Sequence, residues 1–168
     1  TMEHNTNQIT LRGNLSAPPT FSHENHGKLF YRFFLEVPRL SGAADILPVI
    51  AEASLLESAG IDPGRMLTVN DAELEGFLCR EPIYRRTPLG REICDVMLAV
   101  PRAFQRADYL PCILWGRTAQ EASRCHTRDK IGITGRLQSR VYTKLTEEGA
   151  EERTAYEISA LTAQIPMD

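Results

Sequence analysis

Aromatic residues at alternate positions suggest a chemical role for the stretch DYLPCILW of this 168-residue chain. Tyr109 and Trp115 share one parity with Pro111 and Ile113, whereas Leu110, Cys112 and Leu114 have the other. In an extended strand the two parities point to opposite faces, so one face is apolar core and the other carries rings. Exposed rings stack on the bases of an unpaired nucleotide strand, and nearby cations neutralise its phosphates.

The stretch from Lys130 to Thr143 shows the same alternation with more charge. Ile131, Ile133, Leu137 and Val141 lie on one parity. The other parity carries cations, an amide and a ring, namely Lys130, Arg136, Gln138, Arg140 and Tyr142. Alone, this pattern also fits an ordinary solvated sheet face. Together with Phe104, Tyr109 and Trp115 on or beside neighbouring strands, it favours a nucleic-acid-binding surface.

Charge is distributed unevenly along the chain. The formal net charge is −3, which by itself argues against a polyanionic partner. Residues 80–144 nevertheless hold 13 Lys and Arg against 6 Asp and Glu, whereas residues 145–168 hold 1 Arg against 6 acids. The acidic end therefore masks a basic middle.

Other classes of protein find little support. The four cysteines form no CxxC pair, so we expect reduced, mostly buried thiols in a cytoplasmic protein, with no metal and no cofactor. No apolar run reaches the roughly 18 residues that span a membrane. His23 and His26 are expected in a polar loop, and no nucleophile, base and metal set converges. We therefore expect no enzyme activity.

An internal repeat organises the first two thirds of the chain. The segment from Ile9 to Ile50 matches that from Ala72 to Ile113 at a constant offset of 63 positions, including Val37-Pro38-Arg39 against Val100-Pro101-Arg102. Each copy shows alternating strands, a Gly hairpin (Gly27, Gly90) and a short helix, expected at 52–59 and 118–125. Only the second copy continues, with strands expected at 130–143 and 154–165 joined by a polar turn.

The second copy resembles the bacterial single-stranded DNA-binding protein family. The resemblance rests on Gly76-Phe77-Leu78, Asp108-Tyr109-Leu110-Pro111, Trp115-Gly116-Arg117-Thr118-Ala119 and Gly135-Arg136-Leu137-Gln138-Ser139-Arg140. It implies an all-β fold of two tandem OB-fold barrels, each with a short helix between its third and fourth strands and the first copy reduced. The domains expected are residues 1–70 and 71–168.

The resemblance also implies which residues contact DNA. The stacking aromatics would be Phe104, Tyr109, Trp115 and Tyr142, and the basic contact after the third strand would be Arg117. With the other nearby cations, the predicted contact set adds Arg102, Arg106, Lys130, Arg136, Arg140 and Lys144.

The first copy lacks the corresponding rings. It has Ile46 opposite Tyr109 and Glu52 opposite Trp115, so we expect it to be mainly structural. A role in phosphate contact is left open for its cations, Arg12, Lys28, Arg32 and Arg39.

The function expected is sequence-nonspecific binding of single-stranded DNA in replication, recombination or repair. The alternative is a primosome-type OB module that docks a protein on its aromatic face, and RNA binding ranks third. The resemblance suggests a homo-oligomer in which two chains pair to give four barrels. The family's acidic tail, which recruits replication proteins, is not found where this sequence ends at Gln164 to Asp168, so a specialised binder is expected.

Overall fold

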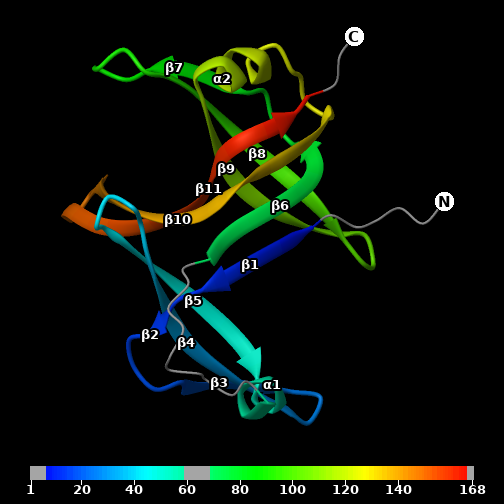
Figure 1. The fold of residues 1–168 in the computed structure, drawn as a ribbon, viewed down its shortest axis with the longest axis vertical. Helices are drawn as coiled ribbons and strands as arrows, with labels where there is room; N and C mark the ends of the chain where they lie inside the picture. Colours follow the sequence, from blue (N-terminus) through cyan, green and yellow to red (C-terminus); the bar gives the residue numbers. More distant parts are fainter. Residues whose placement is uncertain (1–6, 59–68, 166–168) are drawn as a thin grey trace. The chain divides into compact units, whose positions relative to one another are not determined.

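The structure is a computed structural model that describes residues 7–58 and 69–165 (Figure 1). It contains two compact units. One comprises the start of the chain up to Thr10 together with the chain from Asp71 onward, and the other runs from Leu11 to Asn70. Residues 7–10 therefore group with the later unit, although they lie at the start of the sequence.

The later unit, called the barrel unit below, is built on a closed ring of five strands. β6 pairs with both β10 and β8, while β11 lies between β10 and β9, and β9 pairs with β8. β11 and β9 are parallel, and the other four strand pairs of the ring are antiparallel. The ring consists of β6 (Val69–Leu78), β8 (Glu92–Arg102), β9 (Arg106–Trp115), β10 (Lys130–Thr146) and β11 (Gly149–Gln164).

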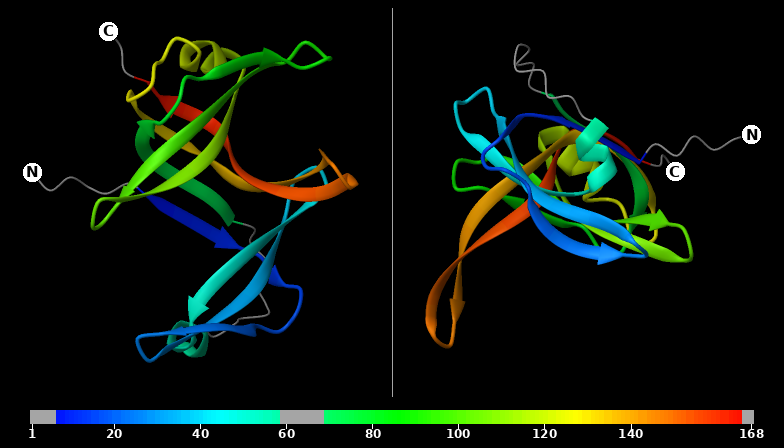
Figure 2. Two further views of the ribbon diagram at one scale, coloured as in Figure 1. Left: turned by 180° about the vertical axis from the view of Figure 1, so that it is seen from behind. Right: turned by 90° about the horizontal axis from the view of Figure 1, so that it is seen from below.

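Three further elements complete the barrel unit. β1 (Gln8–Arg12) pairs with β6, and β7 (Ile83–Arg86) pairs with β8. α2 (Gly116–Ala122) begins directly after β9 and precedes β10. Beyond the stretches that pair with β6 and β9, β10 and β11 continue as a long two-stranded hairpin, visible in orange in Figure 2. A closed five-stranded ring with this helix placement is typical of an OB-fold.

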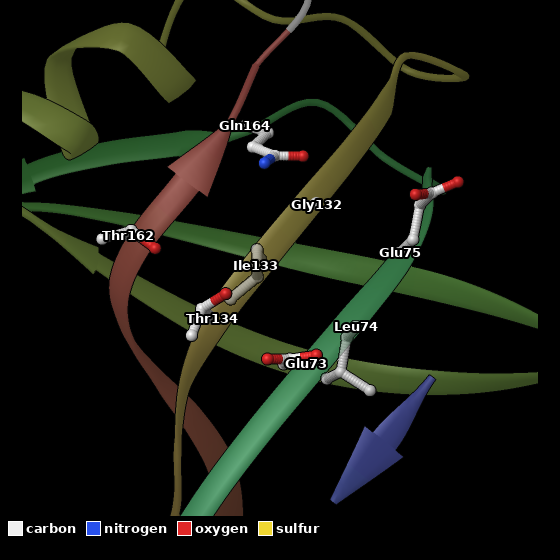
Figure 3. Close-up of a pocket in the computed structure, with 8 residues that line it drawn as sticks. All are labelled: Glu73, Leu74, Glu75, Gly132, Ile133, Thr134, Thr162 and Gln164. Atoms are coloured by element: carbon white, nitrogen blue, oxygen red, sulfur yellow. The ribbon is translucent and has the colours of Figure 1, made fainter. Parts of the chain in front are cut away.

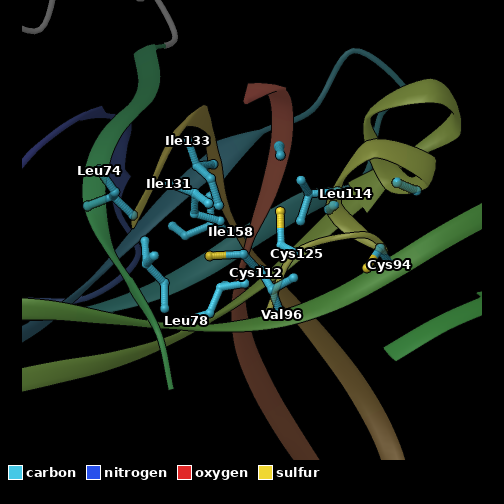
Figure 4. Close-up of a cluster of buried hydrophobic side chains, with 14 of the residues drawn as sticks. Leu74, Leu78, Cys94, Val96, Cys112, Leu114, Cys125, Ile131, Ile133 and Ile158 are labelled. Atoms are coloured by element: carbon cyan, nitrogen blue, oxygen red, sulfur yellow. The ribbon is translucent and has the colours of Figure 1, made fainter. Parts of the chain in front are cut away.

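Alternate residues of each strand fill the barrel. Cys94, Val96, Leu98 and Val100 of β8 are buried together with residues of α2 and the other ring strands. Figure 4 shows Cys94 and Val96 within this cluster. The other strands of the ring contribute further inward-pointing residues to the same core: Cys112 and Leu114 of β9, Ile131 and Ile133 of β10, and Ile158 of β11. Burial raises the pKa of the Cys94 thiol to about 11 and that of Cys112 to about 12. The expectation of buried thiols thus holds for Cys94, Cys112 and Cys125, whereas Cys79 is exposed.

A glycine is required where β6 closes the ring on β8. A Cβ atom added at Gly76 would lie 2.3 Å from the Ala99 carbonyl oxygen, which no side chain tolerates without movement of the backbone. Directly after Gly76, Phe77 pairs with Ala99 and Leu78 with Leu98. The close backbone approach permitted by Gly76 therefore lets the two strands meet.

The earlier unit, called the open unit, is a four-stranded antiparallel sheet. β4 (Lys28–Pro38) lies between its neighbours and pairs with β2 (Asn14–Leu15), β3 (Thr20–Asn25) and β5 (Ala44–Glu52), and α1 (Ala53–Ser58) follows β5. Between residues 11 and 58 there is no counterpart of β10 or β11. The described part of this unit therefore does not close into a ring, and the second complete barrel is not established.

The two units share one pattern of strand pairing. Leu15 pairs with Leu35 as Leu78 pairs with Leu98, at the offset of 63 found in the sequence. Ion pairs follow the same offset: Arg39 contacts Asp45 at 2.6 Å, and Arg102 contacts Asp108 at 3.3 Å. Gly13 approaches the Glu36 carbonyl oxygen in the same way as Gly76 approaches that of Ala99. The repeated sequence therefore has a repeated local structure.

Candidate nucleic-acid interface

The outer face of β9 carries the two rings predicted for it. Since Cys112 and Leu114 point into the barrel, Tyr109 and Trp115 point out. Tyr109 is 64% exposed, whereas Trp115 is half-buried at the end of the strand. Both rings can offer a face to a planar ligand.

Trp115 is fixed by contacts on two sides. Its indole Nε1 donates a hydrogen bond to Ser159 Oγ at 3.1 Å, and the Arg91 guanidinium lies 5.2 Å from the ring centroid. Neither partner was predicted. Ser159 reaches Trp115 only because β11 pairs in parallel with β9, and Arg91 immediately precedes β8. A long-range parallel pairing of this kind leaves no local signal in a sequence.

The basic strand continues the surface that begins at Trp115. Ser159 pairs with Arg136 across β10 and β11, and Gln138, Arg140 and Tyr142 follow on the same face of β10. The Arg140 guanidinium lies 5.7 Å from the centroid of the Tyr142 ring. The structure therefore brings together Trp115, Arg136, Arg140 and Tyr142, which we call the stacking surface.

A buried carboxylate lies within the stacking surface. Glu157 is only 5% exposed, and it accepts hydrogen bonds from Gln138 Nε2 and Arg140 Nε, both at 3.2 Å. These contacts hold the Arg140 side chain beside Tyr142 and partly neutralise its charge. Sequence reasoning counted Glu157 only as one member of the acidic end of the chain. Its position opposite Gln138 follows from the β10–β11 register.

The tip of the β8–β9 hairpin forms a separate group. Phe104 is 94% exposed, has a φ of 62° and lies in the turn between the two strands. Arg102 and Arg106 face one another at the base of this turn, and Arg102 also contacts Asp108. Phe104 therefore projects from the hairpin tip and is not part of the sheet face that carries Trp115.

The remaining predicted cations are dispersed. Arg117 is exposed on α2 and contacts Glu121 at 3.4 Å. Lys144 lies beyond Tyr142 toward the tip of the β10–β11 hairpin, opposite Glu151. Lys130 is at the other end of β10, with its Nζ 2.7 Å from Glu75. The predicted contact set thus extends over the barrel unit as a band and does not form one cluster.

The hollow beside Lys130 has the wrong charge for a phosphate. It has a volume of about 220 Å³ and lies where Gly132 leaves space between β6, β10 and β11 (Figure 3). The carboxylates of Glu73 and Glu75 line its edge, with Thr134 and Gln164. These acids repel a polyanion, so we place the DNA path further along the same outer face of β10, from Arg136 toward Tyr142 over the stacking surface.

Within 7–58 and 69–165, no three His, Cys, Asp or Glu side chains gather in a way that could hold a metal ion. Among the same residues, no helix is both long and apolar enough to cross a bilayer.

In the open unit, the positions equivalent to the two rings have different chemistry. Ile46 occupies the place of Tyr109 and is partly exposed, and Glu52 occupies the place of Trp115 and contacts Lys28 at 3.7 Å. No ring stands at either position, as the repeat implied.

This chain is similar in sequence to proteins named single-stranded DNA-binding protein. Single-stranded DNA-binding protein 1 of Lactococcus lactis is 35% identical over 81 residues, which are 44% of this chain and 54% of that protein. The single-stranded DNA-binding protein of Bacillus cereus is 30% identical over 104 residues, 58% of each chain. The matches span about half the length of these relatives.

The fold comparison extends over both units. The wild-type single-stranded DNA-binding protein of Thermus aquaticus matches with a TM-score of 0.68 at 21% identity, covering 96% of this chain and 93% of that chain. The model of the single-strand binding protein family matches residues 69–166, which include the whole ring and the stacking surface. With more than half of its length matched by that model, the chain belongs to the single-strand binding protein family.

Proposed function

We propose that this chain binds single-stranded DNA without sequence preference, in replication, recombination or repair. The observation that carries the proposal is the stacking surface, where Trp115 and Arg136 on the barrel are followed on the same face by Arg140 and Tyr142 on the β10–β11 hairpin. Rings accept any base, because every base has a π face, and this explains binding without readout of sequence.

Bases would stack on Trp115 and Tyr142, and further along the strand on Tyr109 and Phe104. Each stacked base contributes about 1–3 kcal/mol. The hydrogen bond from Trp115 to Ser159 fixes the indole before DNA arrives, so little side-chain entropy is lost on binding. Arg91 lies over one face of the same ring, so a base must either displace Arg91 or stack on the opposite face.

Phosphates would be contacted by the cations along the band, namely Arg102, Arg106, Arg117, Lys130, Arg136, Arg140 and Lys144. Arg102, Arg117 and Lys130 each form a surface ion pair with a carboxylate. On binding, each would exchange that carboxylate for a phosphate. Such pairs contribute at most about 1 kcal/mol, so the exchange costs little. Release of counterions from DNA makes the affinity fall steeply with salt.

We further propose that the units are tandem copies of one OB-fold, the first reduced to residues 1–70 and the second occupying 71–168. The shared pairing register, ion pair and glycine contact support this origin. Two chains would pair to give a dimer of tandem units, as the family resemblance suggests. Light scattering of the purified chain tests this, and a monomeric mass at micromolar concentration would contradict it.

The test of DNA binding uses the single tryptophan of the chain. Adding oligo-dT at low salt should quench Trp115 fluorescence, and the quench should fade as salt rises. A duplex of the same length is the control for simple charge attraction, and oligo-rU measures preference for DNA over RNA. An emission spectrum unchanged by oligo-dT would refute the proposal. None of the matched proteins named above supports the interaction-module alternative.

A further inference from the structure

The open unit carries aromatic and cationic side chains on one strand, at positions that do not correspond to those of the barrel unit. Phe30, Arg32 and Phe34 alternate along β4 and point away from the face on which Val37 and Leu47 are buried. Across the sheet, Phe34 pairs with Pro48 and Arg32 with Ile50. We call Phe30, Arg32, Phe34 and Ile50 the β4 face.

Of the two rings of the β4 face, Phe34 is exposed, and Phe30 is partly buried and already stacks with another ring. Phe34 is 42% exposed, and Ile50 is also exposed beside it. The imidazole of His23 lies parallel to the Phe30 ring, with centroids 4.7 Å apart and an interplanar angle of 1°. A flat heterocycle thus already stacks on Phe30 in the arrangement that a base would adopt.

A cation lies between the two rings. Arg32 is exposed, and within the described part of the chain it has no ion pair. Phe30 and Phe34 are four residues apart, on the order of 13 Å along an extended strand, and Arg32 is midway. Two bases stacked on the two rings would therefore place the linking phosphates near the Arg32 guanidinium.

We propose that the β4 face is a second contact surface for single-stranded DNA, and this rests on the function proposed above. A packing surface for another protein would leave Arg32 desolvated at its centre without a carboxylate, which is costly. A nucleotide strand supplies both the bases for the rings and the negative charge for Arg32. The occupant that fits the chemistry is therefore DNA.

The shift of position explains why the repeat alone did not reveal this surface. At the offset of 63, Phe30 and Phe34 correspond to Ile93 and Met97 of β8, whereas the rings Tyr109 and Trp115 of the barrel unit lie on β9. The same outer face of the sheet is used in both units, but its aromatic residues are on adjacent strands.

The experiment moves the only tryptophan to this face. In a Trp115→Phe/Phe34→Trp chain, oligo-dT at low salt should quench the indole fluorescence, and added salt should reverse the quench. The matched control is Trp115→Phe/Leu29→Trp, since Leu29 is also 42% exposed on β4 but has the opposite parity. Its fluorescence should not change. Circular dichroism would confirm that both variants are folded.

The outcomes separate the inference from the function on which it rests. No quench at position 34, with Trp115 of the unmodified chain still quenched, would overturn the second surface alone. Absence of quenching in both chains would overturn the proposed function as well. A blue shift at position 34 that grows with protein concentration without DNA would show that a second copy covers the face, and would also overturn the inference.

A second variant tests the cation with the original tryptophan in place. Arg32→Gln should reduce the slope of log affinity against log salt by about 0.7, the value for one lost phosphate contact on a single strand. An unchanged slope would exclude Arg32 from the DNA path.

Discussion

At the scale of single residues, the rings of the stacking surface can be separated from rings that are merely exposed. Tyr142 and Tyr156 are 36% and 38% exposed and lie on opposite faces of the β10–β11 hairpin. Replacing Tyr142 by Ala should weaken binding of oligo-dT by about 1–3 kcal/mol, because one stacked base is lost. Tyr156→Ala should leave the affinity unchanged. Fluorescence anisotropy of a labelled oligonucleotide measures both, and equal losses would contradict the assignment of faces.

The buried Glu157 sets the effective charge of Arg140. Glu157→Gln keeps the shape of the side chain but removes the carboxylate that neutralises Arg140 at 3.2 Å. We expect tighter binding at low salt and a salt slope steeper by about 0.7, because Arg140 becomes available to a phosphate. The control is Glu73→Gln, which removes one charge from the edge of the acidic hollow.

Titrations of affinity against salt for these two variants test the role of Glu157. The Glu73 variant should keep the original slope, and its thermal unfolding shows the effect of a charge change outside the stacking surface. If Glu157→Gln binds more weakly than the unmodified chain, then Glu157 acts mainly by holding Arg140 in place.

At the scale of elements, closure of the ring depends on Gly76. In Gly76→Ala, the new Cβ atom would lie 2.3 Å from the Ala99 carbonyl oxygen. The substitution must therefore push β6 away from β8. We expect a loss of about 1–3 kcal/mol of unfolding free energy, as for other overpacked sites. Gly132→Ala is the matched control in β10, because its nearest neighbour would be Gln164 Oε1 at 3.4 Å. Urea unfolding of both variants measures the difference, and a similar loss in the two would contradict the closure role.

At the level of the strands, the alternation of apolar and polar residues predicted which side chains point outward. The parities of β9 and β10 identified the outward rings and cations correctly, because side chains of a strand alternate whatever the fold around it. The ends of elements were less accurate: the strand expected to end at Thr143 continues to Thr146, and the helix expected at 118–125 spans Gly116–Ala122.

The partners of these residues could not be predicted. Ser159, Arg91 and Glu157 reach the stacking surface through pairings between distant segments, and a single sequence holds no signal for their register. The β4 face was missed for another reason. Its rings were sought only at positions equivalent by repeat to those of the barrel unit.

At the scale of the whole molecule, the net charge is a poor guide to DNA binding, because the positive and negative side chains lie on different parts of the surface. The cations lie along the band on the barrel unit, whereas Glu73 and Glu75 gather at the hollow near the Lys130 end of β10. A chain of net charge −3 can therefore present a basic path to DNA, because a strand on the protein surface responds to the local charge.

The two units should also differ in stability within the folded chain. Every member of the large core cluster, from Ala72 to Ala160, belongs to the barrel unit. In the open unit, the buried residues among those described are Val37, Asp45 and Leu47. Because local unfolding is easiest where few apolar side chains are buried, the amides of β3 and β4 should exchange with solvent through openings of lower free energy than those of β8 and β9.

Hydrogen exchange of the full chain followed by mass spectrometry tests this difference peptide by peptide. Peptides covering Thr20–Asn25 and Lys28–Pro38 should become deuterated well before those covering Glu92–Arg102 and Arg106–Trp115. Saturating oligo-dT should slow exchange in β9 and β10, and also in β4 if the β4 face binds DNA. Equal protection of the two units without DNA would show that they unfold as one cooperative body, and the open unit would then owe its stability to more than its own small core.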